Sequence, residues 1–177
     1  MSRKLLASLA ALFSLHAQAA LQVGDTAPDF TTQAAMAGQA FTYKLSDALK
    51  SGPVVLYFYP AAFTPGCTIE AHNFAEAVDQ YKALGASVIG VSHDDIDTLK
   101  RFSVSECRGK YAVAADPDRR ISKAYDATMT LMPRYASRVS YVIAPDGKVI
   151  YVFSSLSPSK HVENTLAAVR KWAAEKH

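Results

Sequence analysis

The sequence has little of what several protein classes require. Its 177 residues include only two cysteines, and the apolar stretch near its start, Leu5 to Leu15, covers 11 residues. A membrane span needs about 20 apolar residues, so this stretch does not indicate a membrane anchor. Arg119 and Arg120 form an isolated basic pair, which does not indicate nucleic-acid binding. The sequence also lacks a G-x-G-x-x-G loop, an internal repeat and a low-complexity tract, so neither a bound dinucleotide nor a repeat architecture is indicated.

The first 19 residues have the three-part layout of a secretory signal. Arg3 and Lys4 precede the apolar stretch, and small residues follow it at Ala17 and Ala19. We expect cleavage after Ala19 and export across the inner membrane, with the periplasm as destination. The mature chain, residues 20–177, would then have 158 residues, which suits one domain. Without the two basic residues of the signal, 17 basic and 16 acidic side chains remain, so the formal net charge falls from +3 to +1.

Hydrophobic patterning predicts strands and helices in alternation. Val23–Phe30 is extended, and Ala40–Asp47 alternates like a strand. Pro53–Tyr59 and Ala86–Ser92 are apolar on both faces, as in central strands covered by helices. Between them, a helix begins at Cys67 and stops at Gly85. Its inward face is predicted to consist of Cys67, Ala71, Phe74, Val78 and Tyr81.

The rest of the chain predicts a helix, a strand, a short helix, a hairpin and a closing helix. The helix is expected from Asp94 or Asp95 to about Glu106, the strand at Tyr111–Pro117, and the short helix from the Asp116-Pro117 cap. The hairpin is expected at Arg138–Phe153 with a turn at Pro145-Asp146-Gly147, and the closing helix after Ser157 or Ser159. This order predicts an α/β fold with a mixed central sheet flanked by helices, of the thioredoxin-like kind. Ligands of such sheets bind beyond the carboxyl ends of the strands, which is where Cys67 lies.

The position of Cys67 favours a reactive sulfur. If Pro65 takes the first helical turn, Cys67 lies among unpaired backbone N–H groups at the positive end of the helix dipole. Such surroundings favour the thiolate, which is the nucleophilic form of cysteine.

The residues before Cys67 resemble a known signature. Pro60 and Thr64 give the spacing P-x-x-x-T-x-x-C, and "YPAAFTPGCTIEA" resembles the active site of the peroxiredoxins. The form is most similar to the Q-type branch, also called bacterioferritin comigratory proteins. The likeness extends from "VGDTAPDF" to "RVSYVIAPDGKV" and so covers most of the mature chain.

This resemblance implies a peroxidase that reduces hydrogen peroxide and alkyl hydroperoxides. It assigns Cys67 the attack on the peroxide O–O bond, and it assigns Thr64 and nearby backbone N–H groups the donors that meet the developing charge. Pro60 would shield the sulfur from water. The family's active-site arginine corresponds to Arg138, with Arg134 as the nearest competitor. Glu70 is expected to support the helix start and is not counted among the catalytic residues.

A second thiol usually recovers the sulfenic acid by forming a disulfide. Many Q-type proteins carry that cysteine five residues after the first, where this chain has His72. Cys107 is the remaining candidate, and the resemblance allows it to resolve Cys67 after local unfolding of its helix end, with Arg108 favouring its thiolate. In the alternative, Cys107 is a buried apolar residue and an external thiol resets Cys67.

Other functions remain open on the sequence alone. A thioredoxin-like disulfide exchanger would need a C-x-x-C motif, and Thr64 stands in place of its first cysteine. A metal carrier could use His72, His93 and a cysteine, although no histidine pair has ligand spacing. An inactive protein could hold one structural disulfide. No cofactor is indicated. We expect a thioredoxin-like protein or a small thiol as reductant, and a monomer or weak homodimer.

Overall fold

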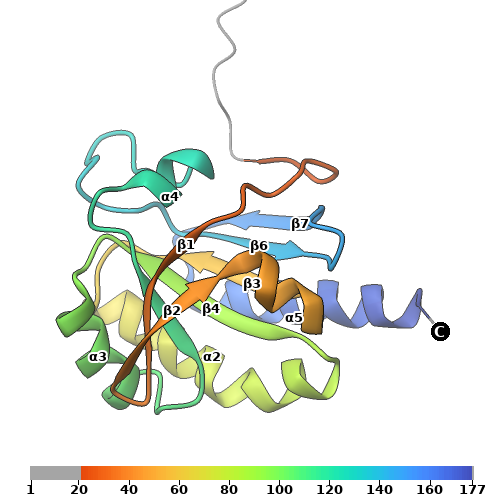
Figure 1. Cartoon of the computed structure of the whole chain (residues 1–177), viewed down its shortest axis with the longest axis horizontal. Coiled ribbons are helices and arrows are strands. Elements are labelled where there is room, and N and C mark those ends of the chain that lie inside the picture. Colours follow the sequence, from red (N-terminus) through yellow and green to blue (C-terminus); the bar gives the residue numbers. More distant parts are fainter. Residues whose placement is uncertain (1–20, 177) are drawn as a thin grey trace, which may run out of the picture.

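The computed structural model describes residues 21–176 as seven strands in one mixed sheet with helices on both faces (Figure 1). The predicted signal and its cleavage point lie outside these residues. The sheet order is β2-β1-β5-β4-β3-β6-β7. The strands span Thr31–Met36 (β1), Gln39–Lys44 (β2), Val54–Phe58 (β3), Ser87–Ser92 (β4), Ala112–Ala115 (β5), Val139–Ile143 (β6) and Val149–Ser154 (β7). The β3, β4 and β5 strands are mutually parallel, whereas β6 runs antiparallel to β3.

Two apolar cores lie on opposite faces of the sheet. One face carries α2 (Pro65–Ala83), α3 (Ile96–Ser105) and α5 (Pro158–Ala174), and Figure 1 shows α2 and α5 running close to each other. The other face is covered by α1 (Leu45–Ala48), a 3₁₀ turn at Leu49–Ser51 and α4 (Arg120–Ala124). All five residues of β3 are buried because successive side chains enter the two cores in turn. The end of β3 is therefore held rigidly, and the loop that follows it starts from a fixed point.

Most predicted elements are confirmed. The α2 helix buries Cys67, Ala71, Phe74, Val78 and Tyr81, as its periodicity predicts. The hairpin forms β6 and β7 and turns at Gly147, whose φ of +80° suits glycine. Of the inward positions expected in α5, Val162, Leu166 and Val169 are buried, while Trp172 is half-buried.

The sequence analysis missed one strand and placed one helix start wrongly. The β1 strand was not expected, because its TTQAAM sequence has few of the large β-branched or aromatic residues that mark a strand. The helix expected from Pro117 begins at Arg120 instead. Asp116 still caps it, because its carboxylate accepts hydrogen bonds from the N–H groups of Ile121 and Ser122 across an intervening turn.

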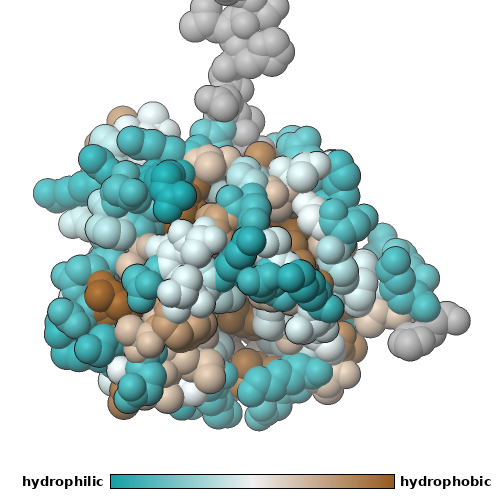
Figure 2. Space-filling model, in the orientation of Figure 1, coloured by the Kyte–Doolittle hydropathy of each residue, from teal (hydrophilic) through white to brown (hydrophobic). Residues whose placement is uncertain are grey.

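The surface is mainly polar, and its exposed apolar side chains are scattered. Figure 2 shows small separate apolar patches on a mostly hydrophilic face, with a strongly apolar one near α3. The most exposed large apolar side chains are Leu131, Leu156 and Val23, at 92%, 82% and 61%. Within residues 21–176, no helix combines the length and the hydrophobicity that a bilayer crossing requires.

Candidate active site

The loop from β3 to α2 brings the predicted signature to the carboxyl edge of the sheet. Pro60 is half-buried just beyond the end of β3, and Thr64 is the N-cap residue of α2. Pro65 begins the helix, where its fixed φ and missing N–H cost nothing. The N–H groups of Gly66 and Cys67 fall in the first turn, which leaves such groups without intrahelical acceptors. The sequence therefore creates an anion-binding corner around Cys67.

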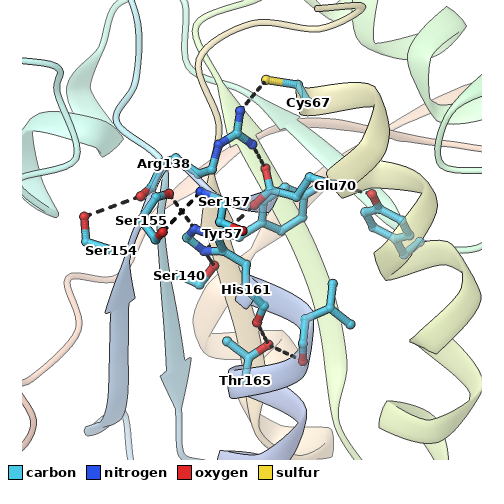
Figure 3. A network of polar contacts seen from close by, with 12 residues as sticks. Tyr57, Cys67, Glu70, Arg138, Ser140, Ser154, Ser155, Ser157, His161 and Thr165 are labelled. Carbon is cyan, nitrogen blue, oxygen red and sulfur yellow. Dashed lines mark hydrogen bonds and ion pairs between the residues drawn. The ribbon is translucent and has the colours of Figure 1, made fainter. Parts of the chain in front are cut away.

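Arg138 reaches this corner from the start of β6, the strand that lies next to β3. It directly precedes β6, whose first residue, Val139, pairs with Phe58 at the end of β3. Its Nη2 donates to the Cys67 Sγ over 3.4 Å, although 71 residues separate the two in the chain (Figure 3). Both side chains are buried, with residue exposures of 8% for Arg138 and 2% for Cys67. A fixed cation thus faces a sulfur that is held away from bulk water.

Arg134, the competing arginine, lies elsewhere. Its guanidinium lies 4.9 Å from the centre of the Tyr135 ring, and its backbone carbonyl accepts a hydrogen bond from His93 Nδ1 at 2.9 Å. The prediction that Arg138 serves Cys67 therefore agrees with the geometry.

Gly66 allows the guanidinium to approach the helix. A Cβ at this position would lie 3.2 Å from Arg138 Nη2, which is closer than most real Cβ contacts. A Cβ here would require the guanidinium to shift by a few tenths of an ångström. The glycine of "TPGC" is thus explained by side-chain space, since its own φ lies outside the left-handed region.

Thr64 is at the mouth of the site, but its hydroxyl is engaged differently from what we expected. Oγ1 donates to the carbonyl oxygen of Ala61 over 3.0 Å. While that bond holds, the oxygen can accept the O–H of a peroxide but has no proton to offer it. Asp94 anchors the same loop, because its Oδ2 accepts the N–H of Ala62 at 2.8 Å.

Glu70 is the functional residue that sequence reasoning missed. It lies one turn after Cys67, is fully buried, and its Oε2 accepts a short hydrogen bond from Nη1 of Arg138. Burial raises the pKa of Glu70 to about 8, although Arg138 opposes the rise. Burial opposes a charge on Arg138 as well, yet its acidic neighbours raise the pKa of the guanidinium above its usual range. The C-x-x-E spacing was the available signal, since residues three apart share a helix face.

Cys107 is buried beyond the C-terminal end of α3, in the same apolar core as Cys67. Both cysteines are free thiols in this structure. Burial raises the pKa of Cys107 to about 12. The expectation that Arg108 favours its thiolate is wrong, because that guanidinium lies 3.3 Å from Glu76 and burial dominates.

The histidines considered as metal ligands point to other partners. His72 pairs with Glu106 at 2.8 Å. His93 lies between the carbonyl of Arg134 and the hydroxyl of Ser122. Within residues 21–176, no group of three or more His, Cys, Asp or Glu side chains is arranged to hold a metal ion.

The raised pKa of Glu70 predicts a pH-dependent stability. Between about pH 4.5 and 8, the folded chain keeps a proton on Glu70 that the unfolded chain has lost, so stability falls as pH rises through this window. Glu70→Gln cannot lose that proton. We expect the free energy of unfolding of this variant, measured in urea, to increase relative to that of the wild type between pH 5 and pH 8. If the two free energies of unfolding changed in parallel with pH across this range, the prediction that folded Glu70 keeps its proton would be wrong.

Comparisons with known proteins agree with this geometry. Residues 23–152 match the model of the AhpC/TSA family. The chain is 36% identical to the chloroplastic peroxiredoxin Q of Triticum aestivum over 122 residues, which cover 68% of this chain and 56% of the relative. It is 33% identical to the peroxiredoxin Q of Oryza sativa subsp. japonica over 144 residues, 81% of this chain and 64% of the relative. The chain thus spans less than two thirds of these plant relatives.

A solved structure gives the same result in three dimensions. Peroxidoxin BcpB from Mycobacterium tuberculosis superposes with a TM-score of 0.77 at 32% identity, covering 85% of this chain and 97% of that one. This similarity includes the thioredoxin-like arrangement of sheet and helices. The chain therefore belongs to the AhpC/TSA family, among the peroxiredoxins of the Q type.

Proposed function

We propose that this protein is a thiol-dependent peroxidase that reduces hydrogen peroxide and alkyl hydroperoxides. The observation that carries the proposal is the 3.4 Å contact between Arg138 Nη2 and Cys67 Sγ at the start of α2. The Cys67 thiolate attacks the terminal peroxide oxygen, a new S–O bond forms as the O–O bond breaks, and the departing oxygen takes up one proton. The products are a sulfenic acid and water or an alcohol.

The surroundings of Cys67 suit this reaction. Negative charge moves from the sulfur to the departing oxygen, and donors fixed beforehand stabilise it at both places. Arg138 supplies a permanent cation, and the N–H groups of Gly66 and Cys67 point into the corner where the peroxide would bind. Thr64 accepts the peroxide O–H in its present orientation, and half-buried Pro60 keeps water from the sulfur.

The alternative of a disulfide exchanger without peroxidase activity lacks its attacking sulfur. Thr64 occupies the N-cap position of α2, three residues before Cys67, where a C-x-x-C motif needs the first cysteine. A hydroxyl at this position cannot form a disulfide. We find no observation that favours this second function.

Cys107 is proposed to resolve the sulfenic acid as an intramolecular disulfide. It shares a core with Cys67, but burial keeps it protonated, so the end of α3 must open first. The turn after Cys107 supports such opening, because Arg108 and Gly109 both have positive φ, at 53° and 66°. A left-handed arginine costs about 1–2 kcal/mol, which local unfolding would release.

The setting of the reaction follows from the proposed export. In the periplasm, a thioredoxin-like domain or a small thiol would reduce the disulfide. No nucleic acid is involved, and no membrane insertion is expected once the signal is removed. We propose a monomer or weak homodimer, supported by the scattered distribution of exposed apolar side chains (Figure 2).

Replacing each of the two cysteines should affect peroxide consumption differently. Cys67→Ser should abolish peroxide consumption with dithiothreitol, because a hydroxyl is not ionised at neutral pH. Cys107→Ser should keep this activity but lose turnover with a thioredoxin-like donor. Mass spectrometry after stoichiometric peroxide should find a Cys67–Cys107 disulfide in the wild type. Its absence would refute the resolving role and leave the peroxidase assignment intact.

Export can be tested on the protein made in a bacterial host. We expect the periplasmic fraction to contain a chain that begins at Ala20, since a signal peptidase would cut after Ala19. Intact-mass measurement and N-terminal sequencing would establish this. A full-length chain confined to the cytoplasm would contradict the proposed location.

A further inference from the structure

A short segment, residues 106–111, carries Cys107 from the end of α3 to the start of β5. Its first part is tied to α3, because the N–H of Cys107 donates to the carbonyl of Phe102 over 3.1 Å. The Cys107 side chain is fully buried, in the core that also holds Cys67. The contacts that hold this segment closed therefore decide when the second thiol becomes available.

Polar side-chain pairs join the segment to α2 at the surface. They are Glu106–His72 at 2.8 Å, Arg108–Glu76 at 3.3 Å and Lys110–Asp79 at 3.8 Å. At least one side chain of each pair is more than a third exposed, so water reaches all of them. Such pairs contribute little to stability, because water screens their charges and ordering long side chains costs entropy. The contact that holds the segment closed must be sought in the interior.

Tyr111 makes that interior contact. It is 3% exposed, and its ring packs against those of Tyr57 in β3 and Phe74 in α2, with centroids 6.2 and 6.3 Å away. Its hydroxyl lies 3.3 Å from the carbonyl oxygen of Ala71, which can only accept, so Tyr111 donates there. The hydroxyl of Tyr57, 2.8 Å away, therefore donates to the Tyr111 oxygen. A buried chain of hydrogen bonds thus runs from β3 through Tyr111 to α2.

Tyr111 also contacts the thiol that the segment carries. Burial raises the pKa of Cys107 to about 12, and a side-chain hydrogen bond with Tyr111 opposes that rise. At the other end of the chain of hydrogen bonds, Ala71 lies about one helical turn after Cys67 in α2. One buried hydroxyl therefore connects the surroundings of the two cysteines.

We propose that Tyr111 is a positioning residue for Cys107: its hydroxyl keeps residues 106–111 closed while Cys67 is reduced, and its release lets the second thiol reach the sulfenic acid. The inference deepens the proposed function and rests on the resolving role that is proposed there for Cys107. Its physical content, that Tyr111 sets how often the Cys107 thiol is exposed, does not depend on any reaction with peroxide.

The step that Tyr111 controls needs no further reactant. The Cys107 sulfur forms the S–S bond as the S–O bond of the Cys67 sulfenic acid breaks, and the thiol proton leaves with the hydroxide as water. A tightly closed segment delays this step, and a second peroxide can then oxidise the waiting sulfenic acid to the sulfinic acid. A loosely closed segment exposes the thiol to other reactions. The Tyr111 contact therefore sets the balance between recovery and inactivation.

The test is the alkylation of Cys107 by iodoacetamide in the reduced protein, with each cysteine followed by peptide mass spectrometry. Tyr111→Phe keeps the ring, removes the bond to Ala71 and leaves the Tyr57 hydroxyl buried without an acceptor. An unsatisfied buried hydroxyl destabilises the closed state, so we expect the initial rate at Cys107 to rise about tenfold or more. The initial rate at Cys67 should not rise with it.

A second substitution makes the result specific to the hydrogen bonds. In Tyr57→Phe/Tyr111→Phe no hydroxyl is left unsatisfied, so Cys107 should react more slowly than in Tyr111→Phe alone, but still faster than in the wild type. If the two tyrosines only filled space, the second loss would instead add to the first. The double variant also decides the question if Tyr111→Phe does not fold, which thermal unfolding of each variant would show.

Tyr141→Phe is the matched control. The Tyr141 hydroxyl is buried in the other core and donates to the carbonyl of Tyr125 over 2.7 Å, so its loss should leave the rate at Cys107 unchanged. Urea separates local opening from unfolding of the whole chain, because opening of residues 106–111 exposes little surface. The rate at Cys107 in the folded wild type should therefore hardly change at low urea. A steep rise there, or faster alkylation in Tyr141→Phe, would contradict local control by Tyr111.

The outcomes separate this inference from the proposed function. After stoichiometric peroxide, the Cys67–Cys107 disulfide should form faster in Tyr111→Phe by a similar factor, while Cys67 is oxidised at its usual rate. An unchanged rate of alkylation at Cys107 in folded Tyr111→Phe, or unchanged disulfide formation despite faster alkylation, overturns the inference. A wild type that peroxide does not oxidise at Cys67 would instead refute the proposed function, and the alkylation rates would still test Tyr111.

Discussion

One guanidinium in a buried site serves two acids, and the rest of the active site is arranged around that constraint. Arg138 contacts the Cys67 sulfur through Nη2 and the Glu70 carboxylate through Nη1. In water both acids could ionise freely, but here each added negative charge must be compensated by the same cation. Burial therefore favours one anion at a time. This competition makes the protonation of Glu70 part of the chemistry of Cys67.

The topology of the sheet produces this meeting. Because β3 and β6 are neighbours and antiparallel, the end of one lies beside the start of the other. The loop after β3 carries the sulfur and the residue before β6 carries the arginine, so a single strand pairing brings them together. The α5 helix packs against α2 and β6. Rigid strands thus hold the reacting groups, and the turn after α3 has positive φ at Arg108 and Gly109.

The sequence predicts the parts of this site that are local. Turn chemistry alone predicts the start of α2 and the position of Cys67 at that start. The roles of Pro60 and Thr64 come from the family resemblance. Arg138 could be assigned to the site because the family resemblance implies its contact with Cys67. Residue spacing does not reveal a contact between segments so far apart in the chain. The sequence suggests only a helix-supporting role for Glu70, because its burial depends on how α2 packs against α5 and the sheet.

Other errors have the same origin in tertiary context. The small residues of β1 form a strand because β2 and β5 pair with it on both sides, and no pattern within TTQAAM reveals this. The thiol of Cys107 was expected to gain from the neighbouring Arg108, but sequence neighbours after a helix end need not share an environment. Arg108 turns to solvent and Glu76, and Cys107 turns to the core. Burial, which the sequence does not display, determines each outcome.

The most direct measurement of the central claim is the rate constant of Arg138→Lys with hydrogen peroxide. Lysine keeps the positive charge but offers a single ammonium group, which cannot hold the sulfur and the carboxylate in separate directions. If one guanidinium must serve both acids, the rate constant at pH 7 should fall about 100-fold or more in a protein that is still folded. A folded Arg138→Lys protein that reacts within about threefold of the wild-type rate would contradict the account.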